Sequence, residues 1–170
     1  MTAMKNPVSP DSPRRRVLAW FAALALAAGA ADTRSQQIAD LATFPRGKLE
    51  ITVGKQKLAF ETWVADTPER QAQGLMFVRS LPAQRGMLFV HESPKPISMW
   101  MKNTYIALDM VFIDGKGRIQ QIAANTTPHS LDVIRSNQPA LAVLEIAGGE
   151  AERLGLKPGQ KVSHPAMPNH

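Results

Sequence analysis

Three charged side chains lie in runs that otherwise have the apolar pattern of β-strands: Lys102, Asp109 and Glu145. Asp109, for example, shares a strand face with Val111 and Ile113. An acid on an apolar strand face is rarely buried unless it is paired. We therefore predict that Lys102 lies in one polar cluster with Asp109, Glu145 or both, where pKa values could shift and a binding site could form. A structural ion pair or a solvated face is the alternative.

The segment 98–104 reads S-M-W-M-K-N-T and contains a second chemical feature, a Met-x-Met pair. Strand alternation divides its side chains between two faces, with Ser98, Trp100 and Lys102 on one and Met99, Met101 and Asn103 on the other. Thioethers select Cu(I), so Met99 and Met101, with His91 as an imidazole ligand, could hold copper. The alternative is that both methionines fill gaps in the core.

One histidine lies where loops often carry function. His129 belongs to the loop T-T-P-H-S at 126–130, which follows a predicted strand. No G-x-S-x-G nucleophile elbow is present, and no histidine in the sequence has metal-ligand spacing. The alternative for His129 is a loop side chain without a functional role. The candidate ligand-binding residues are therefore Trp100, Lys102, Asn103, Asp109, His129 and Glu145.

The elements that must position these residues are short strands separated by turns. Gly54-Lys55 and the D-G-K-G run at 114–117 both predict hairpins. Thr67, Pro68 and Gly74 mark the start and end of a short helix, and a second helical turn is expected over 149–154. No βαβ alternation is apparent. The pattern predicts an all-β fold, a single compact sandwich-like or barrel-like domain of about seven or eight short strands with two short helices.

The composition of the 170-residue chain is that of a globular protein, with 44% hydrophobic and 20% charged residues. It contains no cysteine, which excludes disulfides, thiolate metal sites and cysteine nucleophiles. The net charge of +6 comes partly from Lys5 and Arg14–Arg16 near the N-terminus. The remaining basic residues are scattered without interleaved aromatics, so we do not expect nucleic-acid binding.

The N-terminus has the features of a signal peptide over residues 1–30. Three arginines precede the uncharged apolar run 17–28, which is too short to span a bilayer, and Ala28-Gly29-Ala30 favours cleavage before Ala31. An N-terminal membrane anchor is the alternative. The run P-R-R-R-V-L also resembles the twin-arginine pattern, so twin-arginine and general secretion both stay open. We expect a periplasmic or extracellular protein that meets the membrane only during export.

The sequence thus predicts four parts: a signal peptide at 1–30, a linker at 31–47, the all-β domain at 48–163 and a tail at 164–170. Several strings in the domain resemble those of one bacterial and archaeal family, the domain of unknown function 192. They are TPERQAQGLMFVRSL at 67–81, RGMLFV at 85–90, WMKNT at 100–104, LDMVFID at 108–114, VLEIAGG at 143–149 and GLKPGQKV at 155–162. The resemblance implies a compact β-sandwich-like domain, often exported, with no established activity.

We expect a ligand-binding or interaction module of the cell envelope whose partner is a small ligand or an envelope component. No cofactor is expected in that interpretation. Two alternatives stay open. The first is copper handling through Met99, Met101 and His91, and the second is an envelope hydrolase that uses Lys102 or His129 as its base. A binding module is preferred to an enzyme, because no arrangement of nucleophile and base is visible in the sequence.

Overall fold

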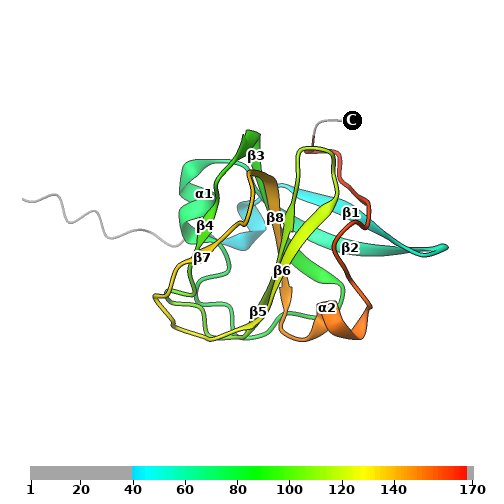
Figure 1. Ribbon diagram of the computed structural model, residues 1–170. Helices are drawn as coiled ribbons and strands as arrows, with labels where there is room; N and C mark the ends of the chain where they lie inside the picture. The colour runs from blue at the N-terminus through cyan, green and yellow to red at the C-terminus, as the bar shows by residue number, and fades with distance from the viewer. Residues whose placement is uncertain (1–39, 168–170) are drawn as a thin grey trace, which may run out of the picture. The chain divides into compact units, whose positions relative to one another are not determined.

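The computed structural model describes residues 40–167 (Figure 1). The predicted signal peptide at 1–30, the first part of the predicted linker (31–39) and the end of the predicted tail (168–170) lie outside the described residues. Within residues 40–167, no helix is long and apolar enough to cross a membrane.

The described chain is built mainly of strands, which confirms the all-β prediction. Seven strands form one mixed sheet in the order β6-β5-β8-β3-β2-β1-β9, and β4 pairs with β7 in a separate two-stranded ribbon. The strands are β1 (Arg46–Val53), β2 (Gln56–Ala65), β3 (Arg85–Lys95), β4 (Ser98–Met99), β5 (Leu108–Ile113), β6 (Ile119–Thr126), β7 (Ile134–Arg135), β8 (Ala140–Ala147) and β9 (Val162–Ser163).

Three helical turns accompany the strands. The 3₁₀ turn η1 (Leu41–Thr43) precedes β1, the helix α1 (Pro68–Gln73) joins β2 to β3, and the helix α2 (Glu150–Arg153) follows β8. Both short α-helices were predicted.

The boundaries of the domain differ slightly from the predicted ones. β1 begins two residues before the predicted start of the domain. Residues His164 and Met167, expected in the tail, are buried at 6% and 5% exposure, so the chain packs on the domain as far as residue 167.

Local turn chemistry explains both predicted hairpins. Val53 pairs with Gln56 across the Gly54-Lys55 turn, where Gly54 has a positive φ of 60° that glycine adopts without strain. In the turn between β5 and β6, the carboxylate of Asp114 accepts hydrogen bonds from the amides of Lys116 and Arg118, both at 2.8 Å. This Asx-type bonding closes the turn and aligns the two strands.

The pairing of β2 with β3 departs from the prediction. These strands run parallel, with Val64 opposite Leu88, and the connection through α1 makes a β-α-β unit that the sequence analysis did not anticipate. A parallel pair needs a crossover between its strands, and a helix commonly supplies it. The crossover places α1 against the same sheet face as β4 (Figure 1), and this face forms the candidate site.

The two edges of the sheet approach each other along a short stretch beside the β5–β6 turn. Arg118, just before β6, forms a single antiparallel bridge with Lys161, just before β9. The amide of Val162 also donates to the Gly117 carbonyl at 2.8 Å. The contact reaches Ile119, the first residue of β6, whose amide donates to the Gln160 carbonyl at 2.9 Å. No pairing of described strands extends it further along β6, so the sheet curls without closing into a barrel.

Both faces of the central strands are buried, and each face has its own apolar cluster. All seven strands contribute to the first cluster, which includes Leu144 of β8 and Ala151 of α2. The second cluster lies on the other face and includes Val143 of β8, Leu75 after α1, and Met101 after β4. Alternation along β5 places Asp109 on the face of the first cluster, and alternation along β8 places Glu145 on the face of the second.

Candidate ligand-binding pocket

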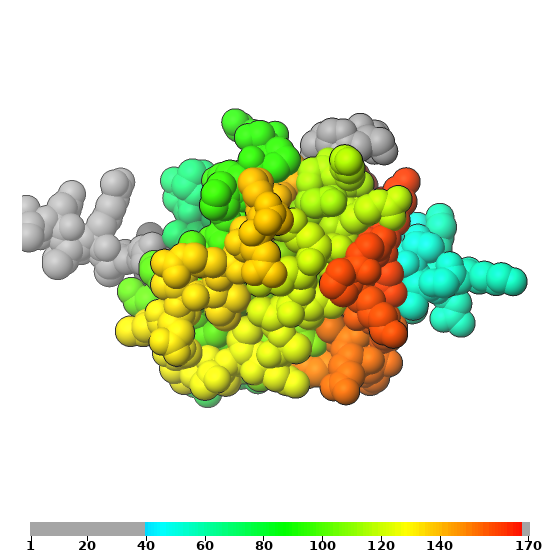
Figure 2. Space-filling view, in the orientation of Figure 1, coloured from blue at the N-terminus to red at the C-terminus, as the bar shows by residue number. Residues whose placement is uncertain are grey.

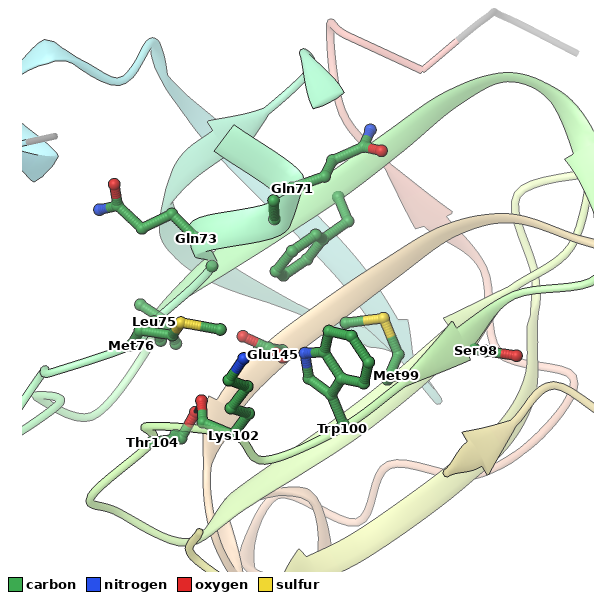
Figure 3. A pocket seen from close by; sticks show the side chains of 13 residues that line it. Gln71, Gln73, Leu75, Met76, Ser98, Met99, Trp100, Lys102, Thr104 and Glu145 are labelled. Carbon is green, nitrogen blue, oxygen red and sulfur yellow. Dashed lines mark hydrogen bonds between the residues drawn. The ribbon is translucent and has the colours of Figure 1, made fainter. Parts of the chain in front are cut away.

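A pocket with a volume of about 130 Å³ opens on the face of the second cluster (Figure 3). Its walls come from four parts of the chain: α1 and the turn after it, β3, the segment that contains β4, and β8. The lining residues are Gln71, Ala72, Gln73, Gly74, Leu75, Met76, Phe89, Ser98, Met99, Trp100, Lys102, Thr104 and Glu145. The pocket therefore depends on the β2-α1-β3 crossover.

Helix α1 is fixed at both ends, which gives the pocket one firm wall. The Thr67 side chain caps its start by accepting from the Arg70 amide at 3.3 Å. The amide group of Gln71 donates to the carbonyls of Ala65 on β2 and Val90 on β3, at 3.2 and 2.9 Å. Gln71 thus anchors the helix to both parallel strands and lines the pocket as well.

Gly74 ends α1 and lets the chain pass close to the sheet. Its φ of 52° lies in the left-handed region. A Cβ at this position would lie 3.1 Å from Phe89 Cζ and 4.0 Å from Glu145 Oε2. A larger residue would therefore strain the backbone and crowd the Phe89 ring beside the Glu145 carboxyl group.

Glu145 is the most unusual group in the pocket. It lies on β8 with 4% of its surface exposed, and its Oε2 has no hydrogen-bond partner among the described residues. Burial raises the pKa of Glu145 to about 8, because an ionised carboxylate loses its hydration. At neutral pH the side chain is therefore largely a neutral acid that can both donate and accept a hydrogen bond.

Lys102 and Trp100 line the same pocket as Glu145, and Figure 3 shows all three side chains directed toward one opening. Lys102 is exposed, and 52% of the Trp100 surface is accessible to solvent. Within residues 40–167, no ion pair of 4.0 Å or less joins Lys102 to an acid. The structure thus brings Lys102 and Glu145 into one pocket but does not pair them directly.

Asp109, the other acid of the predicted cluster, belongs to a different part of the fold. Its Oδ1 accepts from the amides of Asn125 and Gly149 at 2.8 and 3.0 Å, and its Oδ2 accepts from the Ala151 amide at 2.7 Å. These bonds join β5 to β6 and to the start of α2. Asp109 lies on the opposite face of the sheet and does not line the pocket.

Asn103 and His129, two predicted site residues, do not line the pocket. Asn103 has a φ of 56°, and its side-chain amide lies 3.9 Å from the sulfur of Met76. His129 is exposed, and its ring contacts the Tyr105 ring in a tilted arrangement with the ring centres 5.1 Å apart. These two predicted site residues belong to the loops beside the pocket.

The methionine pair separates at the end of β4. Met99 lines the pocket, whereas Met101 is buried in the second cluster, where its sulfur accepts from the Thr126 hydroxyl at 3.1 Å. The predicted alternation fails because β4 is only two residues long and a turn follows, in which the Thr104 amide donates to the Met101 carbonyl. Met99 therefore lines the pocket together with Trp100 and Lys102.

His91 does not join the methionines around the pocket. It lies on β3, half-buried, and burial and the nearby Lys95 lower the pKa of His91. Among the described residues, no group of three or more His, Asp or Glu side chains could hold a metal ion. The pocket is lined by two thioethers, from Met76 and Met99, and by no imidazole.

The sequence analysis missed the α1 side of the pocket. The motif at 67–81 carried the family resemblance, but its individual residues were not considered as site residues. The available signal was Gly74, a helix-terminating glycine followed directly by the apolar pair Leu75 and Met76. That pattern predicts a close approach of the chain to the core, and the pocket forms at this approach.

The domain matches one family model over residues 49–164, a family described as "Uncharacterized ACR". Two solved structures are similar. A proposed transcription regulator from Sinorhizobium meliloti 1021 is 35% identical, with 71% of this chain and 95% of that chain covered and a TM-score of 0.69. A protein of unknown function from Novosphingobium aromaticivorans DSM 12444 is 37% identical, with 74% and 90% covered and a TM-score of 0.71. No curated protein matches the chain.

Proposed function

The chain belongs to the domain of unknown function 192 family, and we propose that it is a binding module for a small ligand that carries a carboxylate group. One observation carries the proposal: a buried Glu145 carboxyl with an unpartnered oxygen lies in the same pocket as the exposed cation of Lys102. A buried polar group without a partner costs about 1–3 kcal/mol, and a ligand that reaches it would recover part of that free energy.

The charges in the pocket select the ligand chemistry. Glu145 is largely neutral at pH 7, so Lys102 provides the net positive charge of the pocket. A carboxylate could accept one hydrogen bond from the Lys102 ammonium and one from the protonated Glu145. An ammonium ligand would instead be repelled by Lys102 and would require Glu145 to ionise.

The size and walls of the pocket limit the ligand further. A volume of about 130 Å³ is smaller than the roughly 300–1,000 Å³ of typical pockets for drug-sized ligands. The pocket therefore fits a short acid or the acidic end of a longer molecule. The exposed Trp100 indole forms an apolar wall beside it, against which the carbon skeleton of the ligand could pack.

Binding can be measured by NMR on the indole N–H of Trp100, with propionate and propylammonium as probes of equal length and opposite charge. We expect propionate to shift the Trp100 signal and propylammonium to leave it unchanged. Lys102→Met should weaken propionate binding at least about tenfold, because it removes the cation. Lys116→Met, at an exposed lysine in the β5–β6 turn, is the matched control and should bind as the original chain does.

The pH dependence separates this proposal from simple ion pairing. Propionate affinity should fall as pH rises through about 8, because ionised Glu145 repels the probe. In Glu145→Gln the fall should disappear, since the amide still donates a hydrogen bond but does not titrate. A preference for propylammonium, or equal binding by Lys102→Met, would contradict the proposal.

We also propose that the domain works outside the cytoplasmic membrane, on the basis of the charged and apolar pattern of residues 14–30. N-terminal sequencing of the protein from fractionated bacterial cells should find a start near Ala31. A cytoplasmic protein that begins at Met1 would contradict this part.

A further inference from the structure

The exposed apolar side chains of the domain gather on three loops. Among residues 40–167, every large hydrophobic side chain with high exposure follows α1, lies between β4 and β5, or lies between β6 and β7. These residues, which we call the apolar loop surface, are Phe77 (38% exposed), Trp100 (52%), Tyr105 (38%), Leu131 (68%) and Val133 (44%). Single exposed apolar residues are ordinary, but a gathered set marks an interaction surface.

Backbone hydrogen bonds tie the three loops into one unit. The Phe77 amide donates to the Asn103 carbonyl at 2.8 Å, and the Met101 amide donates to the Ser130 carbonyl at 3.0 Å. The His129 amide donates to the Thr104 carbonyl at 3.1 Å. The loops are therefore held side by side, and Figure 2 shows residues 127–133, in yellow, on the surface of the domain.

Two residues whose side-chain rings lie at this surface have strained backbone conformations. Phe77 and His129 have φ angles of 65° and 62°, in a region that bulky residues rarely adopt. Their rings flank Tyr105, with ring centres 5.9 and 5.1 Å from its own. Backbone strain of this kind concentrates at functional sites.

The loops are also basic. The Arg79 guanidinium lies 4.9 Å from the Tyr105 ring centre, and Lys102 and Arg135 are exposed nearby in sequence. Asp132 is the only acid within the segments 74–84, 100–107 and 127–135. The combination of aromatic and aliphatic side chains with a surplus of cations complements an anionic lipid surface, where Trp and Tyr prefer the interface and basic groups contact headgroups.

In contrast to the expectation that the protein meets the membrane only during export, we propose that the apolar loop surface docks the folded domain on a membrane that contains anionic phospholipid. Leu131 and Val133 enter the boundary between headgroups and acyl chains, and Trp100 and Tyr105 lie at the headgroup level. Arg79 and Lys102 contact lipid phosphates. The surface shares Trp100 and Lys102 with the pocket, but Leu131 and Val133 do not line the pocket, so variants at these two residues test the membrane contact separately.

The test uses the chain from Ala31, since the apolar run 17–28 would itself bind lipid. The two solved relatives consist almost entirely of the matched domain, 95% and 90% of their chains, so this domain folds without that run. Sedimentation with vesicles of equal parts phosphatidylcholine and phosphatidylglycerol should carry the protein down. Vesicles of phosphatidylcholine alone, or added salt, should reduce the bound fraction.

Two variants locate the contact. Leu131→Ser with Val133→Ser should weaken vesicle binding roughly tenfold, and Arg79→Glu should weaken it on anionic vesicles. Lys116→Glu changes the net charge equally at the other end of the β5–β6 hairpin and should leave binding nearly unchanged. Propionate binding should persist in the Leu131/Val133 variant, which separates this test from that of the pocket.

Several outcomes would overturn the proposal. The original chain could fail to bind anionic vesicles, or the Leu131/Val133 variant could bind them as well as the original. A dimer in sedimentation velocity that is lost in the same variant, without vesicle binding, would assign the surface to a second copy of the chain instead.

Discussion

Asp109 and Glu145 are both buried acids on neighbouring strands of the same sheet, yet their surroundings differ completely. In the pairing of β5 with β8, Asp109 lies opposite Ile146 and Glu145 lies opposite Met110, so the two carboxyl groups point to opposite faces. Asp109 accepts three backbone N–H bonds, whereas the Glu145 Oε2 accepts none.

This difference shows two uses of a buried carboxyl group. Asp109 organises the fold, because its two oxygens accept hydrogen bonds from backbone amides of β6 and of the start of α2. The Glu145 Oε2, in contrast, accepts no hydrogen bond among the described residues, and Glu145 lines the pocket. A buried acid therefore indicates a candidate binding site only when its hydrogen-bonding capacity remains unused.

The largest expected effect on stability comes from removing Asp109, the acid whose two oxygens are both hydrogen-bonded to backbone amides. Asp109→Ala should lower the free energy of unfolding by roughly 3–6 kcal/mol, since three backbone amides lose their acceptor. Urea denaturation of the chain from Ala31 measures this change. Asp132→Ala, at an exposed loop acid, is the control and should change stability by less than about 0.5 kcal/mol. A similarly small effect of Asp109→Ala would remove the contrast between the two acids.

A smaller effect is expected from the pH dependence of stability. The pKa of Glu145 is raised by burial to about 8 in the folded protein from an ordinary value of 4.5, so the folded state holds its proton more tightly than the unfolded state. The contribution of Glu145 is therefore fully present below pH 4.5 and is lost as pH rises through about 8, by roughly 2–4 kcal/mol in total. The measurement is urea denaturation across this pH range.

Glu145→Gln tests the origin of that dependence. The variant should lose most of the decline in stability between pH 4.5 and pH 8, because the amide does not titrate. At pH 5 its stability should lie within about 1 kcal/mol of the original, since an amide replaces a neutral acid of similar shape. An unchanged pH profile in this variant would show that another group titrates.

The smallest effect is expected from Lys102→Met. The side chain is exposed and forms no ion pair within 4.0 Å among the described residues, so its loss should change stability at pH 6 by less than about 0.5 kcal/mol. Thermal and urea unfolding would both detect a larger change. A loss above about 2 kcal/mol would show that Lys102 holds the fold together and would count against its role as a free ligand contact.

The parts of this fold that depend on local chemistry were predictable from the sequence. Gly54-Lys55 and residues 114–117 form the predicted turns, and Thr67 and Gly74 cap α1 as expected. These residues act on neighbours within a few positions, so their spacing carries the information.

Pairings between distant segments could not be predicted in the same way. The parallel contact of β2 with β3 joins residues more than twenty positions apart, such as Trp63 and Met87, and alternation alone does not specify it. Likewise, Asp109 and Glu145 both appeared as acids on apolar strand faces. Backbone amides of β6 and of the start of α2 bond to Asp109, whereas the Glu145 Oε2 has no partner among the described residues. The sequence pattern does not distinguish these two surroundings.

The short strand β9 has a consequence for the behaviour of the folded protein in concentrated solution. It pairs with part of β1, and residues 159–161 just before it bond to Arg118 and Ile119 at the start of β6, so this segment covers stretches of both β1 and β6. Exposed strand edges recruit other chains and begin aggregation. A protein that ends before residue 156 would expose both stretches and should aggregate more readily. The segment 156–163 therefore protects the sheet against self-association.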